Sequence, residues 1–200
     1  VSLGDRGVRF GSDAGRAVTS STASLTIRGD DLEYNDLSFG FSNSLESTGT
    51  VVMESHSSSF SSAFDYENFD LDPSVSSLRI GKTTNTANVV IKDPVAMAGP
   101  ISIYGGDILL EEDLTSTLSG ADVLVKGRGD VEAVASRSFL TNNGDIVFWS
   151  NSDNSGVGSI KLGNDNVLNS SNGRSGDTDS GGGKITLGGG SGYGTSPTGY

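Results

Sequence analysis

The apolar side chains of this chain recur as pairs, two residues apart, at a nearly constant spacing through the middle of the sequence. The pairs are Leu78/Ile80, Ile101/Ile103, Val123/Val125 and Ile146/Phe148, followed less regularly by Ile160/Leu162 and Ile185/Leu187. The four regular pairs follow one another at steps of 23, 22 and 23 residues. A fixed period of this size is typical of stacked coils, each too small to bury its own apolar face alone.

Short runs rich in Val, Ile and Thr predict β-strands, and turn-forming residues bound most of them. The runs are Ser24–Arg28, Thr50–Glu54, Ser77–Ile80, Asn88–Lys92, Ile101–Tyr104, Asp107–Leu110, Asp122–Lys126, Val131–Ala135, Asp145–Trp149, Ser159–Leu162 and Lys184–Leu187. No long stretch has the 3.6-residue apolar period of a helix, so the helix content should be low. Small residues followed by Asp precede several runs, as at Gly106-Asp107 and Gly144-Asp145, which predicts a bend at an equivalent point of each coil.

Two all-β architectures fit these strands: a sandwich of antiparallel hairpins, or a parallel β-helix (β-solenoid) in which each turn stacks on the last. Hairpins favour two-residue Asn-Gly loops, and the chain has them at Asn143-Gly144 and Asn172-Gly173, neither symmetrically flanked. The repeat favours the parallel β-helix, because one turn with two or three short strands uses about 22–23 residues. We therefore predict a parallel β-solenoid.

The spacing also divides the chain into parts. Residues 76–190 should form the regular repeats, and residues 191–200 a Gly/Ser-rich tail or linker. In residues 1–75 the pairs Leu25/Ile27 and Val51/Met53 continue the series at steps of 26 and 27 residues, which predicts irregular coils with longer loops or a cap. The aromatic segment Phe60–Leu71 is interpreted as an inserted loop or cap packed over a solenoid edge, with an aromatic ligand-binding surface as the alternative.

Composition and charge exclude several classes of protein. The net charge of −12 repels phosphate backbones and anionic lipid surfaces, so we expect no nucleic-acid partner. The absence of Cys excludes disulfides and cysteine-ligated metals. No apolar stretch approaches the roughly 20 residues that span a bilayer, so we expect no direct membrane span. The chain begins at Val1 without an initiator Met or a signal peptide, and we expect it to be a piece of something longer.

Part of the repeat region resembles a known family. Leu78–Ile91 and Ala98–Ile108 resemble the repeats of large bacterial surface adhesins of the filamentous haemagglutinin type, and Thr141–Asp153 and Gly183–Gly190 are similar to their Gly-Asp-Ile and Ile-Thr-Leu-Gly-Gly-Gly motifs. The match covers roughly Leu78–Gly190. The resemblance implies a right-handed parallel β-helix, exported and displayed on the bacterial cell surface as part of a long extracellular fibre.

Two copies of Arg-Gly-Asp, at Arg28-Gly29-Asp30 and Arg128-Gly129-Asp130, are the candidate adhesion residues. A receptor that reads this tripeptide needs an exposed loop tip. The alternative is a pair of simple turns at strand ends, where Gly and Asp are common.

Catalysis and metal binding have weaker candidates. Polysaccharide-cleaving β-helices use clustered carboxylates, for which Asp70, Asp72, Glu111 and Asp113 are available, with Glu112 expected on the opposite side of its strand. The single histidine, His56, lies among serines without a nucleophile-elbow motif. Oxygen-rich loops at Asn151–Ser155 and Asn164–Asn166 offer calcium ligands, although ordinary Asx turns also explain them.

The sequence therefore predicts a non-catalytic structural and adhesive segment of a bacterial surface fibre, without a cofactor. Its partners would be neighbouring repeats of the same chain, further copies stacked end to end because exposed coil ends are adhesive edges, or a carbohydrate or protein receptor. A polysaccharide-active enzyme and a calcium-dependent carbohydrate-binding module are the alternatives.

Overall fold

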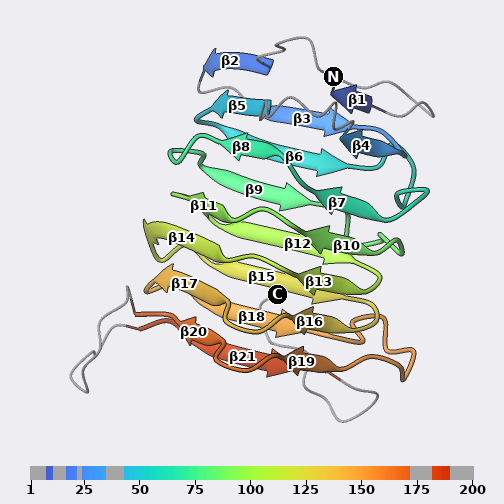
Figure 1. Cartoon of the computed structure of the whole chain (residues 1–200), viewed down its shortest axis with the longest axis vertical. Helices are drawn as coiled ribbons and strands as arrows, with labels where there is room; N and C mark the ends of the chain where they lie inside the picture. The colour runs from blue at the N-terminus through green and yellow to red at the C-terminus, as the bar shows by residue number, and fades with distance from the viewer. Residues whose placement is uncertain (1–7, 11–16, 22–23, 35–42, 172–181, 190–200) are drawn as a thin grey trace.

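Three short strands and the bends between them form each coil of the chain, and the coils stack into a right-handed parallel β-helix (Figure 1). The computed structural model describes residues 8–10, 17–21, 24–34, 43–171 and 182–189. Within these residues there is no helix, and hence no helical segment able to cross a membrane. Every third strand along the chain enters the same column, so the strands of a coil belong to three different columns.

The first column is a seven-stranded parallel sheet, which we call the long sheet. Its strands, in chain order, are β3 (Leu25–Arg28), β6 (Thr50–Glu54), β9 (Ser77–Ile80), β12 (Ile101–Gly105), β15 (Val123–Gly127), β18 (Ile146–Trp149) and β21 (Ile185–Gly188). The recurring apolar pairs of the sequence, except Ile160/Leu162, lie here as partners in neighbouring strands.

The second column follows the long sheet within each coil. Its strands are β1 (Val8–Phe10), β4 (Leu32–Tyr34), β7 (Phe64–Tyr66), β10 (Val89–Ile91), β13 (Ile108–Leu110), β16 (Val131–Ala133) and β19 (Ile160–Leu162). Strands β7 to β19 form one five-stranded sheet, and β1 pairs separately with β4.

The third column completes each coil. Its strands are β2 (Ala17–Ser21), β5 (Asn43–Ser47), β8 (Phe69–Leu71), β11 (Val95–Met97), β14 (Leu114–Ser119), β17 (Ser138–Asn142) and β20 (Val167–Asn169). Hydrogen bonding divides it into a three-stranded sheet, β2-β5-β8, and a four-stranded sheet, β11-β14-β17-β20. None of these strands was among the runs predicted from the sequence.

The register of the long sheet confirms the predicted period. Ile101 pairs with Leu78 on one side and Val123 on the other, and Val123 pairs with Ile146, which gives steps of 23, 22 and 23 residues. Leu25 pairs with Val51, so the longer first steps belong to the same column. All pairings between named strands in the described residues are parallel, so the antiparallel sandwich is wrong.

Two sequence-based interpretations need correction. The pair Ile160/Leu162 does not belong to the long sheet; Ile160 pairs with Val131 in the second column, and the next strand of the long sheet is β21. The long turn after Trp149 shifts the chain out of the simple period. The spacing alone did not reveal this shift, because both columns carry apolar residues at alternate positions.

The aromatic segment Phe60–Leu71 is neither a cap nor a ligand-binding surface. Phe64 and Tyr66 are 1% exposed and point inward from β7, with Asp65 between them pointing outward. Phe60 stacks on Phe64 at 5.1 Å between ring centroids, and Tyr66 stacks on Phe69 at 5.2 Å. Strand alternation, rather than a loop, places these rings in the core.

The core is one continuous apolar column enclosed by the three sheets. It extends from Ile27 in β3 to Phe148 in β18, and Phe139 meets Phe148 edge to face at 5.0 Å. Ile101, Ile103, Val123 and Val125 have no exposed surface. Each coil contributes only a few side chains to this core, so every coil depends on those above and below it for burial.

Truncating an inward side chain should therefore lower the free energy of unfolding far more than truncating its outward neighbour. Ile103→Ala removes buried methyl groups from a side chain with 0% exposure. We expect the free energy of unfolding to fall by about 2–5 kcal/mol. Ser102→Ala, one residue earlier on the outer face, should change stability by less than about 0.5 kcal/mol. Urea unfolding followed by circular dichroism measures both, and equal effects would contradict the alternation.

Candidate functional site

Polar side chains at one corner of the β-helix connect each coil to the next. The corner lies between the long sheet and the second column, where Asn88, Asp107 and Asp130 occupy equivalent positions. Asn88 Oδ1 accepts the backbone N–H of Asp107 at 2.9 Å, and Asp107 Oδ1 accepts that of Asp130 at 2.9 Å. Asp130 Oδ1 accepts the N–H of Ser159 at 2.7 Å. Here the small-residue-Asp steps of the sequence form the predicted bends.

Corresponding hydrogen bonds precede the strands of the other two columns. Asp122 Oδ1 accepts the backbone N–H of Asp145 at 2.7 Å, and Asp145 Oδ1 accepts that of Lys184 at 2.7 Å. Asp113 Oδ1 accepts the N–H of Ser138 at 2.9 Å. An Asp at these positions satisfies a backbone donor that the turn leaves unpaired. Five Asp side chains thus link neighbouring coils at these corners.

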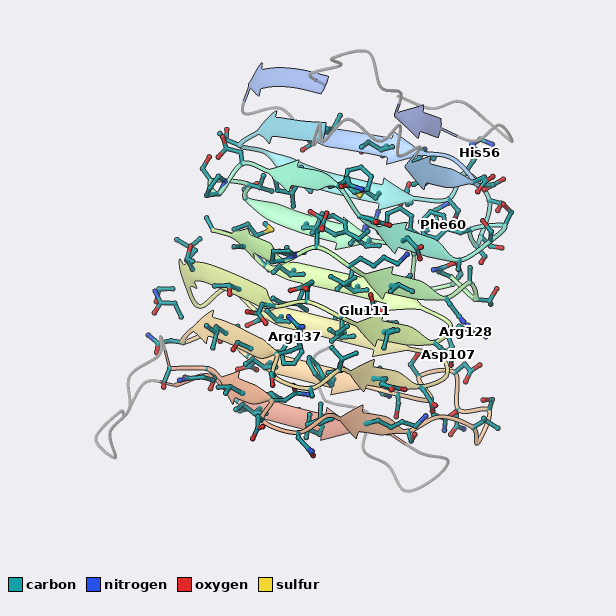
Figure 2. The ribbon with its side chains drawn as sticks, in the orientation of Figure 1. His56, Phe60, Asp107, Glu111, Arg128 and Arg137 are labelled. Carbon is teal, nitrogen blue, oxygen red and sulfur yellow. The ribbon has the colours of Figure 1, made fainter. Side chains whose placement is uncertain are left out.

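The second Arg-Gly-Asp sequence lies at the first of these corners, where Figure 2 shows Arg128 close to Asp107. Arg128 forms an ion pair with Asp153 at 3.3 Å, and its side chain is 35% exposed. Gly129 lies so close to the preceding coil that a Cβ atom would come within 2.1 Å of Asp107 Oδ1. A side chain at position 129 would therefore displace the Asp107 carboxylate, which accepts the N–H of Asp130.

Asp130 is engaged on both carboxylate oxygens. Oδ2 accepts a hydrogen bond from Lys161 Nζ at 2.5 Å, and Oδ1 accepts the Ser159 hydroxyl at 3.0 Å as well as its N–H. The hydrogen bond from Lys161, followed by the N–H of Ser159, lowers the pKa of Asp130 below its ordinary value of 3.8. The side chain remains 34% exposed.

The first Arg-Gly-Asp sequence is engaged in the same way. Asp30 Oδ1 accepts the backbone N–H of Ser57 at 2.7 Å, and this bond is the main cause of the lowered pKa of Asp30. Gly29 is buried and donates its N–H to the backbone oxygen of Glu54 at 3.1 Å. Both Arg-Gly-Asp sequences are thus turns at strand ends, with their Asp side chains bound to the following coil.

A buried carboxylate, Glu54, was missed by the sequence reasoning. Its side chain is 4% exposed and forms ion pairs with Arg28 from the coil before and with Arg79, at 2.6 Å, from the coil after. Two arginines satisfy the charge that burial would otherwise penalise. The available signal was the spacing, because both arginines lie close to one coil length from Glu54 in the sequence.

The carboxylates proposed for polysaccharide cleavage are divided between two corners. Glu111–Asp113 lie at the corner between the second and third columns, whereas Asp72 follows the third column at the next corner. Glu112 pairs with Arg137 at 2.9 Å, and Figure 2 shows Glu111 in the same part of the molecule, away from Arg128. The Ser74 hydroxyl lowers the pKa of Asp72. The side chain of Asp70 lies outside the described residues.

The remaining candidates serve local turns. His56 is exposed, and the neighbouring hydroxyls of Ser55 and Ser57 donate to backbone oxygens. In the first proposed calcium loop, Asn151 Oδ1 accepts the N–H of Gly156 at 3.0 Å and the Ser155 hydroxyl at 3.1 Å. In the second loop, Asn166 Oδ1 accepts the N–H of Arg137 at 2.8 Å. No group of three His, Asp or Glu side chains in the described ranges is arranged to hold a metal ion.

The outer face of the long sheet carries an unexpected cluster. Leu124 and Val147 occupy outward positions, yet only 8% and 0% of their surfaces are exposed. Beside them, Lys126 Nζ lies 3.9 Å from the centre of the Trp149 ring, a cation–π contact. Burial lowers the pKa of Lys126. From the alternation of inward and outward residues, both positions were expected to face solvent. The burial of Leu124 and Val147 was therefore not predicted.

Fold and corner geometry define the protein as a parallel β-solenoid whose polar side chains serve inter-coil contacts. Comparison of the chain with protein-family models, with curated proteins and with solved structures finds no match in any of the three.

The bonds of Asp130 predict a pH dependence of stability. Because its pKa is lower in the folded than in the unfolded chain, its contribution is complete above the unfolded pKa and is lost as the pH falls through the folded value. Asp130→Asn keeps an acceptor for Ser159 but loses the ion pair, so its unfolding midpoint should be lower at neutral pH and converge with that of the parent in acid. Urea titrations between about pH 7 and pH 2 measure this. A difference that stays constant with pH would contradict it.

Proposed function

We propose that the chain is a non-catalytic structural and adhesive segment of a bacterial cell-surface fibre. The observation that carries the proposal is the continuous stack of three-stranded coils around one core. Such a stack extends in one dimension, with each coil contacting only its neighbours, and its length can grow without any change in cross-section. The resemblance of Leu78–Gly190 to surface-adhesin repeats supports the same role.

The use of the polar side chains supports a non-catalytic role. In the described residues, every carboxyl group with a displaced pKa has it lowered; these groups are Asp30, Asp72, Asp130 and Asp153. A glycoside hydrolase needs the opposite, a carboxylic acid whose raised pKa keeps it protonated. Lowered pKa values are expected for carboxylates that accept hydrogen bonds within the fold.

For the adhesive part, we propose the two Arg-Gly-Asp turns as contacts for a protein or carbohydrate receptor at the surface. The Arg28 and Arg128 side chains are 41% and 35% exposed, and each is held by one carboxylate, Glu54 or Asp153, so a receptor would contact their solvent-facing sides. The net charge of −12 repels anionic groups from most of the surface. An anionic group of a receptor would therefore be attracted mainly by these two arginines.

A panel of acidic and neutral polysaccharides tests the non-catalytic role. We expect no turnover by the purified chain, because Asp72 lies at a different corner from Glu111 and Asp113, and Asp113 Oδ1 is bound to the N–H of Ser138. Turnover that disappears in Glu111→Gln but persists in Glu132→Gln, a matched change on an exposed strand position, would replace the structural proposal with the enzymatic one. Product formation followed by reducing-end assay and mass spectrometry provides the readout.

Surface display is the second test. Antibodies raised against the purified chain should label intact cells of the source, and protease added outside the cells should remove the signal. An antibody to an intracellular enzyme of the same cells serves as the control for integrity. Labelling that requires permeabilised cells would refute the proposed location.

A further inference from the structure

The outer face of the long sheet is basic, although the chain as a whole is acidic. Its seven strands carry three basic residues, Arg28, Arg79 and Lys126, and one acidic residue, Glu54. The strands of the second column carry two basic and three acidic residues, and those of the third column carry two acidic residues and no basic one. In a chain with net charge −12, positive charge is therefore concentrated on one face.

The basic residues of this face follow the stacking of the coils. Arg28 lies on β3, Arg79 on β9 and Lys126 on β15, so every second strand of this part of the sheet carries a cation (Figure 1). Because parallel strands lie about 4.8 Å apart, successive cations are about 9.6 Å apart along the axis. Arg28 and Arg79 share the buried Glu54, yet each side chain is 41% exposed.

Aromatic side chains occupy strands that alternate with the later cations. Tyr104 on β12 pairs with Lys126 on β15, and Lys126 pairs with Trp149 on β18. All three side chains are partly exposed, whereas the neighbouring outward residues Leu124 and Val147 are buried and offer no contact. We call the exposed set the axial row; it consists of Arg28, Arg79, Tyr104, Lys126 and Trp149.

The charge of Lys126 is not neutralised within the described part of the chain. The ion pairs found there involve Arg28, Arg79, Lys92, Arg128, Arg137 and Lys161. Lys126 instead places Nζ 3.9 Å from the centre of the Trp149 ring, and burial lowers its pKa. A partly desolvated cation without a carboxylate is favourably placed for an anionic ligand.

We infer that the axial row binds an acidic polysaccharide, extended along the axis of the β-helix. Carboxylates of the polymer would meet the three cations, and sugar rings would lie against Tyr104 and Trp149, whose aromatic surfaces suit the apolar faces of pyranoses. Pyranose residues of an extended chain repeat at a distance close to one coil, so alternate sugars come into step with the cations. The inference rests on the proposed adhesive function and names the chemical class of its ligand.

A nucleic acid or an anionic membrane fits the row less well. A nucleic acid carries one phosphate charge per about 3.4 Å of each strand of a duplex, whereas the row offers three cations over about 19 Å. The net charge of −12 repels so dense a charge, and it repels an anionic lipid surface in the same way. Sparse carboxylates on a chain of sugar rings match the row in both spacing and chemistry.

Binding of polygalacturonate, alginate and hyaluronan to the purified chain tests the inference, with the neutral methyl ester of each polymer as its control. Calorimetric titration measures the affinity. Trp149 is the only Trp of the chain, so its fluorescence reports contact at the row. We expect at least one acidic polymer to bind, to shift the Trp149 emission, and to bind at least about tenfold more tightly than its ester.

Variants locate the binding on the axial row. Lys126→Gln removes a cation without breaking an ion pair and should weaken binding by about fivefold or more. Tyr104→Ala should weaken it by about threefold or more. Lys161→Gln is the matched control, because Lys161 is 54% exposed and lies on β19 in the second column. Its affinity should stay within about twofold of the parent. Urea unfolding of each variant checks that the fold is retained.

Failure of all three polymers to bind, or equal binding of their esters, would overturn the inference. Equal binding of polyglutamate or of single-stranded DNA, which lack pyranose rings, would also overturn it, as would equal losses in Lys126→Gln and Lys161→Gln. The fibre proposal fails separately, by the absence of label on intact cells. A displayed segment without polysaccharide binding would retain the structural role, whereas a polysaccharide-binding protein confined to the cell interior would do the reverse.

Discussion

The structure depends on parallel hydrogen bonding between coils in a fixed register. A coil of three short strands cannot pair its own backbone groups or bury its own apolar residues, so both requirements are met only by the coils above and below. A slip of one residue in any strand would turn the inward side chains outward. The vertical alignment of Ile101, Val123 and Ile146 is the form that this constraint takes in the long sheet.

The polar residues serve the same constraint at the corners. Asp107 and Asp130 each accept a backbone N–H of the following coil, and Glu54 joins arginines from the coils on either side. In an acidic chain with few apolar residues, these contacts between coils add to the stability that the small apolar core provides. Both Arg-Gly-Asp sequences lie at strand ends, where their Asp side chains accept backbone N–H groups of the following coil.

The sequence predicted the long sheet and most of the second column, because apolar residues alternate clearly there and return at a constant step. It did not predict the strands of the third column. Leu114–Ser119 contains mostly Ser and Thr, so alternation is weak, although Leu114 and Ser116 are buried. The aromatic residues of Phe60–Leu71 were assigned to a cap because their density concealed the in–out pattern of β7. Contacts such as Glu54 with Arg79 depend on stacking, which a local pattern does not contain.

Amide hydrogen exchange on the intact chain tests the central claim most directly, because it reports the hydrogen bonds between coils residue by residue. The account predicts slow exchange in all three columns of the middle coils, including the Ser- and Thr-rich strand β14, and faster exchange in the terminal strand β21. Protection confined to alternating residues of paired hairpins, or a β14 that exchanges as freely as an unfolded segment, would contradict a β-helix built from three stacked columns.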